Sequence, residues 1–254
     1  MRNKIGIIQG RLTQFPSQIL QQFPQKNWKK EFSIAKDLKL NFIELISEKK
    51  FNPSNPIWSN EGRKKIKKIN QKNKLINYSL CDDFFLSNHI LKKNSKIIDQ
   101  HIKKILNATS DLKLKVLVLP LLEKNDLRKF SKNYYLNFLT DLAIEFKKSK
   151  IIICIETLEN HYKIDKLLCK INLENIKYTF DTGNMNYKKI KVPQDILILN
   201  DFIHHIHIKD KDSKDKSVMI GEGKTEFNKI LKSLKKINYK GSFVFETPRG
   251  KNPI

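Results

Sequence analysis

Histidines and carboxylates stand inside or at the ends of several apolar runs of this sequence. Residues 202–210 read FIHHIHIKD, and the period of two is typical of a β-strand. On such a strand His205, His207 and Lys209 share one face. Three further carboxylates end apolar runs elsewhere, namely Glu156, Asp181 and Glu246. Imidazole is a common metal ligand and a general acid–base at neutral pH, so these four segments are the candidates for chemistry.

Three buried carboxylates around one opening would repel one another unless a cation neutralised them. With His207 they form an oxygen-rich set of four ligands, Glu156, Asp181, His207 and Glu246. One Mn²⁺, Mg²⁺ or Co²⁺ ion suits this set better than a thiolate-type zinc site, and catalytic zinc stays an alternative. A metal with open positions can hold two adjacent sugar oxygens and stabilise an enediolate. Glu156 and Glu246 would then exchange the proton as general base and acid.

Parallel strands would bring the carboxyl ends of these four segments to one place. The hydrophobic pattern predicts eight strands in alternation with helices. The expected strands are Lys4–Ile8, Asn41–Ile46, Leu75–Leu80, Lys115–Pro120, Ile151–Thr157, Lys177–Asp181, Phe202–Asp210 and Gly241–Thr247. The expected helices are about 28–38, 59–71 with Ser59 as the cap, 88–110, 133–148, 162–169, 193–199 and 225–236. No hairpin signal between strands is apparent.

Eight such units in 254 residues predict one α/β domain over residues 1–254, a single (β/α)8 TIM barrel with a parallel eight-stranded sheet. An open doubly wound sheet is the second choice. It would normally carry a glycine-rich phosphate loop after the first strand, which Gln9-Gly10-Arg11 is not. The six residues Arg249–Ile254 leave little room for a last outer helix, which we expect to be short or absent.

The composition excludes several other classes of protein. The net charge is +24, but the lysines are spread over nearly every expected helix, so a nucleic-acid partner is disfavoured. Three scattered cysteines lack metal spacing and indicate a reducing compartment. No membrane span or signal-type run is apparent, so we expect a cytoplasmic protein with a small-molecule partner. A homo-oligomer is left open.

Several short motifs in order resemble the xylose-isomerase-like TIM barrels, in the branch of sugar phosphate isomerases and epimerases. They are Gly6-Ile-Ile-Gln-Gly-Arg11, Ile43-Glu44, Ile155-Glu156-Thr157, Asp181-Thr-Gly-Asn184, His205-Ile-His-Ile-Lys-Asp210, Gly221-Glu-Gly223 and Glu246-Thr-Pro-Arg-Gly250. The resemblance implies a carbohydrate isomerase or epimerase that works through a metal-bound enediolate. It implies the same four metal ligands and the same pair of proton-transferring glutamates as the residues themselves.

Substrate contacts are expected from residues near the same strand ends, namely Arg11, Glu44, Asn184, Lys209 and Lys211. Lysines in the loops after the last two strands could hold a phosphate or carboxylate, because barrels favour anions there. The sequence therefore leaves open whether the substrate is a sugar or a sugar phosphate.

Two other functions stay open from the sequence. One is a sugar-binding barrel without turnover. The other is an abasic-DNA endonuclease, since the same superfamily contains such enzymes with a zinc cluster and extra histidines. Asn184 stands where one of those histidines would be, and Asp82, Asp83 and Pro120 occupy earlier strand ends. The multi-zinc alternative is therefore distant.

Overall fold

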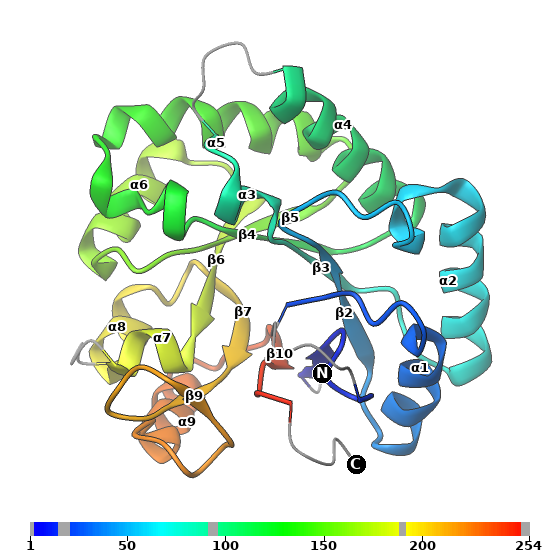
Figure 1. Cartoon of the computed structure of the whole chain (residues 1–254). Helices are drawn as coiled ribbons and strands as arrows, with labels where there is room; N and C mark the ends of the chain where they lie inside the picture. Colours follow the sequence, from blue (N-terminus) through cyan, green and yellow to red (C-terminus); the bar gives the residue numbers. More distant parts are fainter. Residues whose placement is uncertain (1–2, 15–20, 91–95, 188–191, 250–254) are drawn as a thin grey trace.

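The computed structural model describes residues 3–14, 21–90, 96–187 and 192–249. Eight parallel strands form a closed barrel in the order β1-β10-β7-β6-β5-β4-β3-β2, and helices surround it (Figure 1). These strands are β1 Lys4–Ile8, β2 Phe42–Ser47, β3 Ser79–Asp82, β4 Val116–Pro120, β5 Ile152–Glu156, β6 Ile176–Asp181, β7 Ile203–Ile208 and β10 Ser242–Phe245. Pairing of β1 with β10 closes the sheet, which confirms the predicted TIM barrel.

Several strands of the barrel are buried on both faces. Every residue of β2 and β4 is buried, and four of the five residues of β5 are. Strands in a parallel barrel face side chains inside and helices outside, which is why these runs are almost continuously apolar. A polar residue in such a run must therefore have a partner, and Glu44 in β2 and His205 in β7 are two cases.

The helices follow the strands as expected. The α-helices are α1 Trp28–Asp37, α2 Asn60–Asn73, α3 Phe84–Ser87, α4 Lys96–Asp111, α5 Lys132–Lys147, α6 His161–Ile171, α7 Thr182–Tyr187, α8 Val192–Ile198 and α9 Phe227–Lys236, and the 3₁₀ turns are η1 Pro56–Trp58, η2 Glu123–Asn125 and η3 Leu127–Lys129. Ser59 caps α2 as predicted, since its hydroxyl accepts from the Gly62 amide at 3.0 Å.

The structure corrects the prediction around the third strand. We expected the strand at 75–80, but β3 spans Ser79–Asp82. Leu75 and Ile76 instead donate their amides to Asn70 and Asn41, which joins the end of α2 to the sheet. The helix expected at 88–110 is described from Lys96 onward, and residues 91–95 lie outside the described residues. The short helix α3 was not predicted, and it buries the apolar residues Phe84 and Phe85.

A small hairpin follows β7, although none was expected. Its strands β8 Asp210–Lys211 and β9 Ser217–Val218 pair antiparallel. Asp210 holds the loop beyond it, because the carboxylate accepts from the amides of Gly221, Gly223 and Thr225 at 2.9–3.0 Å. A Cβ atom at Gly223 would meet the Asp210 carboxylate at 2.2 Å, so that position needs glycine. The hairpin turn itself is held by Asp212, whose Oδ1 accepts from the amides of Lys214 and Lys216 at 2.8 and 2.9 Å.

Asp210→Asn should lower the free energy of unfolding by about 1–3 kcal/mol at pH 7, because an amide NH₂ would face backbone N–H donors. Burial alone raises the pKa of Asp210, but the Thr225, Gly223 and Gly221 donors outweigh it and the pKa is lowered. The stabilisation is therefore complete above the unfolded pKa of about 3.9 and is lost as pH falls through the lower folded pKa.

Urea unfolding at pH 7 and pH 3 measures this effect. Asp215→Asn is the control, since its side chain is exposed and pairs only at the surface with Lys211. An Asp210→Asn deficit of equal size at both pH values would contradict the assignment.

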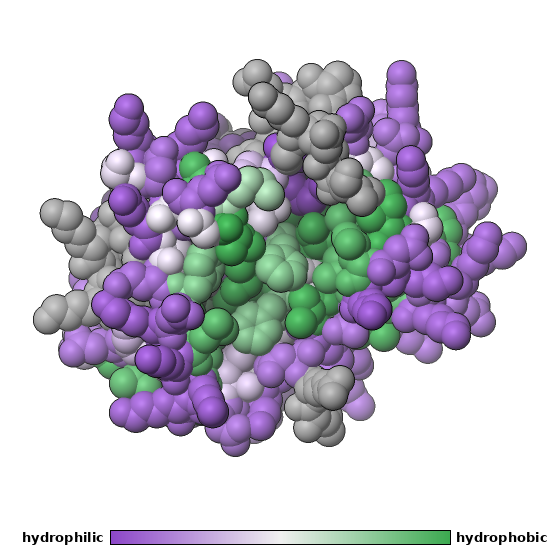
Figure 2. Space-filling view, turned by 90° about the horizontal axis from the view of Figure 1, so that it is seen from below, coloured by the Kyte–Doolittle hydropathy of each residue, from purple (hydrophilic) through white to green (hydrophobic). Residues whose placement is uncertain are grey.

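The outer face of β1 and β10 is less covered than the rest of the barrel. Residues 246–249 are not helical, and residues 250–254 lie outside the described part of the chain. Ile5 is 41% exposed, and Phe243 and Phe245 are only partly buried. The view from below shows apolar side chains gathered in the middle of that face with hydrophilic ones around them (Figure 2). Among the described residues, no helix is long and apolar enough to cross a membrane.

Candidate active site

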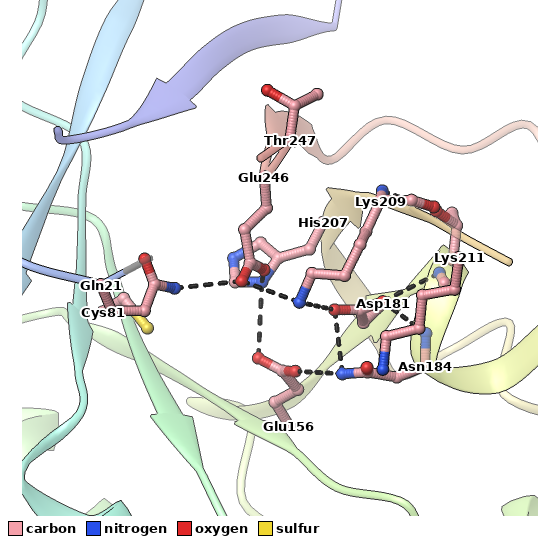
Figure 3. A network of polar contacts seen from close by, with 12 residues as sticks. Gln21, Cys81, Glu156, Asp181, Asn184, His207, Lys209, Lys211, Glu246 and Thr247 are labelled. Atoms are coloured by element: carbon pink, nitrogen blue, oxygen red, sulfur yellow. Dashed lines mark hydrogen bonds and ion pairs between the residues drawn. The ribbon is translucent and has the colours of Figure 1, made fainter. Parts of the chain in front are cut away.

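The four predicted metal ligands lie together at the carboxyl-terminal mouth of the barrel (Figure 3). Glu156 ends β5, Asp181 ends β6, His207 lies in β7, and Glu246 follows β10 directly. All four are buried. Parallel strands bring their ends to one rim, so residues up to 90 positions apart in the sequence meet in one place.

His207 is oriented by a carboxylate below it. Its Nε2 lies 2.9 Å from Glu44 Oε1, which turns Nδ1 toward the mouth. Nδ1 is 3.0 Å from Glu246 Oε2 and 3.4 Å from Glu156 Oε2. Although burial opposes it, Glu44, Glu156 and Glu246 together raise the pKa of His207 well above its usual range. Glu44 fixes Nε2 in the way that a carboxylate fixes the far nitrogen of a metal-bound histidine, and Nδ1 is the ring atom that faces the other carboxylates.

Glu44 belongs to a layer beneath the mouth. It is fully buried, and its second oxygen lies 2.8 Å from His205 Nε2, while His205 Nδ1 lies 2.7 Å from the Ser242 hydroxyl. Burial alone would raise the pKa of Glu44, but His205 and His207 lower it to about 2. Burial lowers the pKa of His205, which fits a neutral ring that donates to Glu44 and accepts from Ser242. Glu44 thus lies against the two histidines, and its expected contact with substrate stays a prediction.

Asp181 and Asn184 are fixed by the turn into α7. Asp181 Oδ1 accepts from the amides of Gly183 and Asn184 at 2.9 and 2.8 Å. The Asn184 side-chain amide donates to Asp181 Oδ2 at 3.0 Å and to Glu156 Oε1 at 3.1 Å. Asn184 therefore holds the two carboxylates side by side, and its expected contact with substrate stays a prediction.

Lys209 is the resident cation of the mouth. Its ammonium lies 2.9 Å from Asp181 Oδ2 and 2.7 Å from Glu246 Oε1. Burial lowers the pKa of Lys209, but Asp181 and Glu246 outweigh it and the pKa is raised. A Cβ at Gly183 would come within 2.9 Å of the Lys209 side chain, so glycine there leaves room for the lysine to reach inward.

The donor set fits a divalent cation. Glu156, Asp181 and His207 each offer one ligand atom within 4.8 Å of the others. Glu246 lies outside that group of three, although its Oε2 is 3.0 Å from His207 Nδ1, and Lys209 and Gln21 bind its Oε1 at 2.7 and 3.0 Å. Burial raises the pKa of Glu156, whereas Lys209 and His207 lower the pKa of Glu246 against its burial. Glu44, His205 and His207 also lie within metal-binding distance, but hydrogen bonds already account for their contacts.

The family assignment rests on the whole fold and on a match of sequence. A profile of the family described as xylose isomerase-like TIM barrel matches residues 32–254. The chain belongs to this family.

Two of the proteins that the chain resembles are named as carbohydrate epimerases. A putative L-ribulose-5-phosphate 3-epimerase, SgbU of Escherichia coli K12, is 35% identical over 83 residues, and this match covers 29% of each chain. The fold is similar to 3-keto-D-glucoside 4-epimerase YcjR of E. coli, with a TM-score of 0.73, 17% identity, and 99% and 95% of the two chains covered. The zinc-bound IolI protein gives a TM-score of 0.76 at 14% identity, with coverage of 98% and 91%.

Two predicted substrate residues of this xylose isomerase-like barrel already have partners within the chain. Arg11 is buried and donates through Nε to Thr247 O at 2.7 Å and through Nη2 to Gln21 Oε1 at 2.8 Å. Burial lowers the pKa of Arg11 to about 10. Lys211 pairs with Asp215 at 2.7 Å. The roles of Arg11 and Lys211 as substrate contacts stay predictions. Each side chain would have to exchange these internal contacts for contacts with the substrate.

Gln21 and Asp83 were missed as site residues by the sequence reasoning. Gln21 lies in a loop without periodicity, and no local signal marks it as a partner of Glu246. Asp83 follows β3, and its Oδ2 is buried without a hydrogen-bond partner among the described residues. Burial, with Glu246 and Glu156 nearby, raises the pKa of Asp83 well above its usual range. Its place after a strand was the one available signal.

Proposed function

We propose that this protein is a divalent-metal-dependent carbohydrate isomerase or epimerase. The observation that carries the proposal is the convergence of Glu156, Asp181 and His207 at the barrel mouth, where each offers one ligand atom within 4.8 Å of the others. The names of the similar family members agree with the reaction class, although each of those likenesses is partial in sequence.

The ion would be held by Glu156, Asp181, His207 and Glu246. Such an ion polarises a carbonyl and stabilises negative charge on the adjacent oxygen. Lys209 would have to leave its position between Asp181 and Glu246, or share it, when the ion binds. The side chains that orient these ligands already contact them, because Glu44 fixes His207 and Asn184 fixes Asp181 and Glu156.

The two glutamates carry the proton. One carboxylate removes a proton from the carbon next to the substrate carbonyl, and the C–H electron pair moves toward the carbonyl oxygen to give an enediolate. The other glutamate, in its acid form, returns a proton to carbon. Both side chains lie within 3.4 Å of the same imidazole nitrogen, so they border one small reaction space.

Metal analysis tests the proposed binding of a divalent ion. After dialysis against Mn²⁺ and removal of free ion, we expect about one ion per chain. His207→Ala should weaken Mn²⁺ binding by more than about 100-fold, because outer-shell changes alone cost 10–100-fold.

His204→Ala is the matched control, since this neighbour lies on the opposite face of β7 and is partly exposed. Equal Mn²⁺ affinity in the two variants would contradict the assignment of His207. Several ions per chain would point to cluster chemistry instead.

Hydrogen exchange between the substrate and heavy water tests the proposed proton transfer. Ketoses and aldoses incubated with the Mn²⁺ protein should take up deuterium at the carbon next to the carbonyl, as followed by NMR. A protein that binds sugars and the ion but never exchanges this hydrogen would be a binding barrel without turnover.

A further inference from the structure

Three backbone donors in the loop after β7, which is one of the two loops of the usual phosphate corner of a barrel, are already occupied. TIM barrels commonly bind phosphate with the loops after the last two strands of the barrel. Here the amides of Gly221, Gly223 and Thr225 all point at Asp210, at 2.9–3.0 Å. An internal carboxylate therefore takes the donors that would otherwise surround an anion.

The cations of that corner are engaged as well. Lys209 is bound by Asp181 and Glu246, and Lys211 by Asp215. Arg11 donates to Thr247 O and Gln21, and Arg249 donates through Nε to Gly10 O. A phosphate dianion would have to break one of these contacts for each bond that it gained, so the corner offers it little net attraction.

A cavity of about 970 Å³ lies on the other side of the mouth. The loop after β2, residues 48–53, forms much of its wall, and Gln21, Leu86 and Glu123 complete it from neighbouring loops. Gln21 also donates to Glu246 Oε1 at 3.0 Å. The cavity therefore begins beside a carboxylate that we assign to proton transfer, and it has the size of a small-molecule site.

The charged groups of the cavity wall balance one another. Two glutamates, Glu48 and Glu123, face two lysines, Lys49 and Lys50, so their formal charges cancel. Lys49 pairs with Glu123 at 2.6 Å. Glu48 accepts from the side-chain amides of Asn52 and Asn55 at 2.9 and 3.3 Å. Polar groups that can exchange hydrogen bonds without excess charge suit hydroxyl groups better than a phosphate.

The wall also presents an aromatic ring. Phe51 is 52% exposed, and its ring is held by Trp58 at a centroid distance of 5.5 Å and by the Lys104 ammonium at 4.5 Å. An exposed ring fixed at the edge of a polar cavity can pack against the C–H face of a sugar, whereas a phosphate gains nothing from it.

We propose that the substrate is an uncharged sugar, without a phosphate, whose non-reacting end lies in the cavity of residues 48–53. This inference rests on the proposed function, since it names the substrate class of the same site. It revises the expectation that lysines after the last two strands hold an anionic end.

Paired probes test the inference. L-Ribulose, D-fructose and D-tagatose are compared with L-ribulose 5-phosphate, D-fructose 6-phosphate and D-tagatose 6-phosphate, in heavy water with the Mn²⁺ protein. We expect deuterium uptake from an uncharged member with a kcat/KM at least about 10-fold above that of its phosphate. A preference for the phosphates would overturn the inference and leave the isomerase intact. No exchange from any of the six would overturn the proposed function, and the inference with it.

Variants of the cavity wall locate the bound end. Phe51→Ala should raise the KM of the best uncharged sugar roughly 3–10-fold, with kcat and Mn²⁺ content unchanged. Tyr162→Ala is the matched control, because this aromatic residue of α6 is 58% exposed and is not part of the cavity wall. Equal KM values for wild type and Phe51→Ala would overturn the inference. A Lys50→Met variant whose KM changes for the sugar phosphates alone would overturn it as well.

Discussion

Glu246→Gln should abolish deuterium exchange from one epimer of the substrate, and Glu156→Gln should abolish it from the other. Each loss should reach roughly 10²–10⁴-fold, which is the usual contribution of a positioned general base. The physical reason is that an amide cannot accept the substrate proton, while its carbonyl oxygen can still face the ion. Initial rates of exchange from each purified epimer, measured by NMR with Mn²⁺ present, give the result directly.

The two variants serve as controls for each other, because a simple loss of metal would silence both epimers in both proteins. Mn²⁺ content therefore has to be measured on the same samples. Glu222→Gln is a third variant, since this glutamate is exposed in the loop after β9 and should exchange at the rate of the wild type. Rates at the level of the wild type from both epimers in Glu246→Gln would remove Glu246 from the proton path.

The sequence was sufficient for the barrel because the relevant forces are local and repetitive. Runs such as those of β4 and β5 are apolar throughout, and the helices between the strands have helical periodicity. The third strand was misplaced because the apolar Leu75 and Ile76 lie in a connection, where backbone bonds to Asn70 and Asn41 hold them. The hairpin after β7 was missed because its strands, β8 and β9, are only two residues long, which is too short for an alternating hydrophobic pattern.

The meeting of the candidate site's side chains at one mouth was predictable from the sequence, but their pairings were not. Carboxylates after apolar strands must share the mouth of a parallel barrel, so Glu156, Asp181 and Glu246 could be chosen from the sequence. Which cation each of them would contact depends on side-chain direction across strands. Lys209 was assigned to an anionic substrate, yet it turns inward to Asp181 and Glu246 because Gly183 leaves room for it.

Glu44→Ala should lower the free energy of unfolding by about 3–5 kcal/mol, because it leaves two buried imidazole groups without their carboxylate. The pKa of Glu44 gives a similar figure. Its fall from the ordinary 4.5 to about 2 corresponds to about 3 kcal/mol of stabilisation. Because the folded pKa is the lower one, this stabilisation is complete above pH 4.5 and disappears as the pH falls toward 2. Urea unfolding at pH 7 and at pH 3 should therefore show a smaller deficit in acid.

Metal binding separates an orienting role of Glu44 from a purely structural one. Glu44→Gln keeps the volume of the side chain but offers only one oxygen to two imidazole nitrogens, so His207 should lose its fixed orientation. We expect Mn²⁺ affinity to fall about 10–100-fold in this folded variant, as for other outer-shell partners of metal-bound histidines. Glu61→Gln on the exposed surface of α2 should change neither the stability of the protein nor its Mn²⁺ affinity. If Glu44→Gln lost stability while it bound Mn²⁺ as the wild type does, Glu44 would be a core residue only, and the orientation of His207 would have to come from the carboxylates above it.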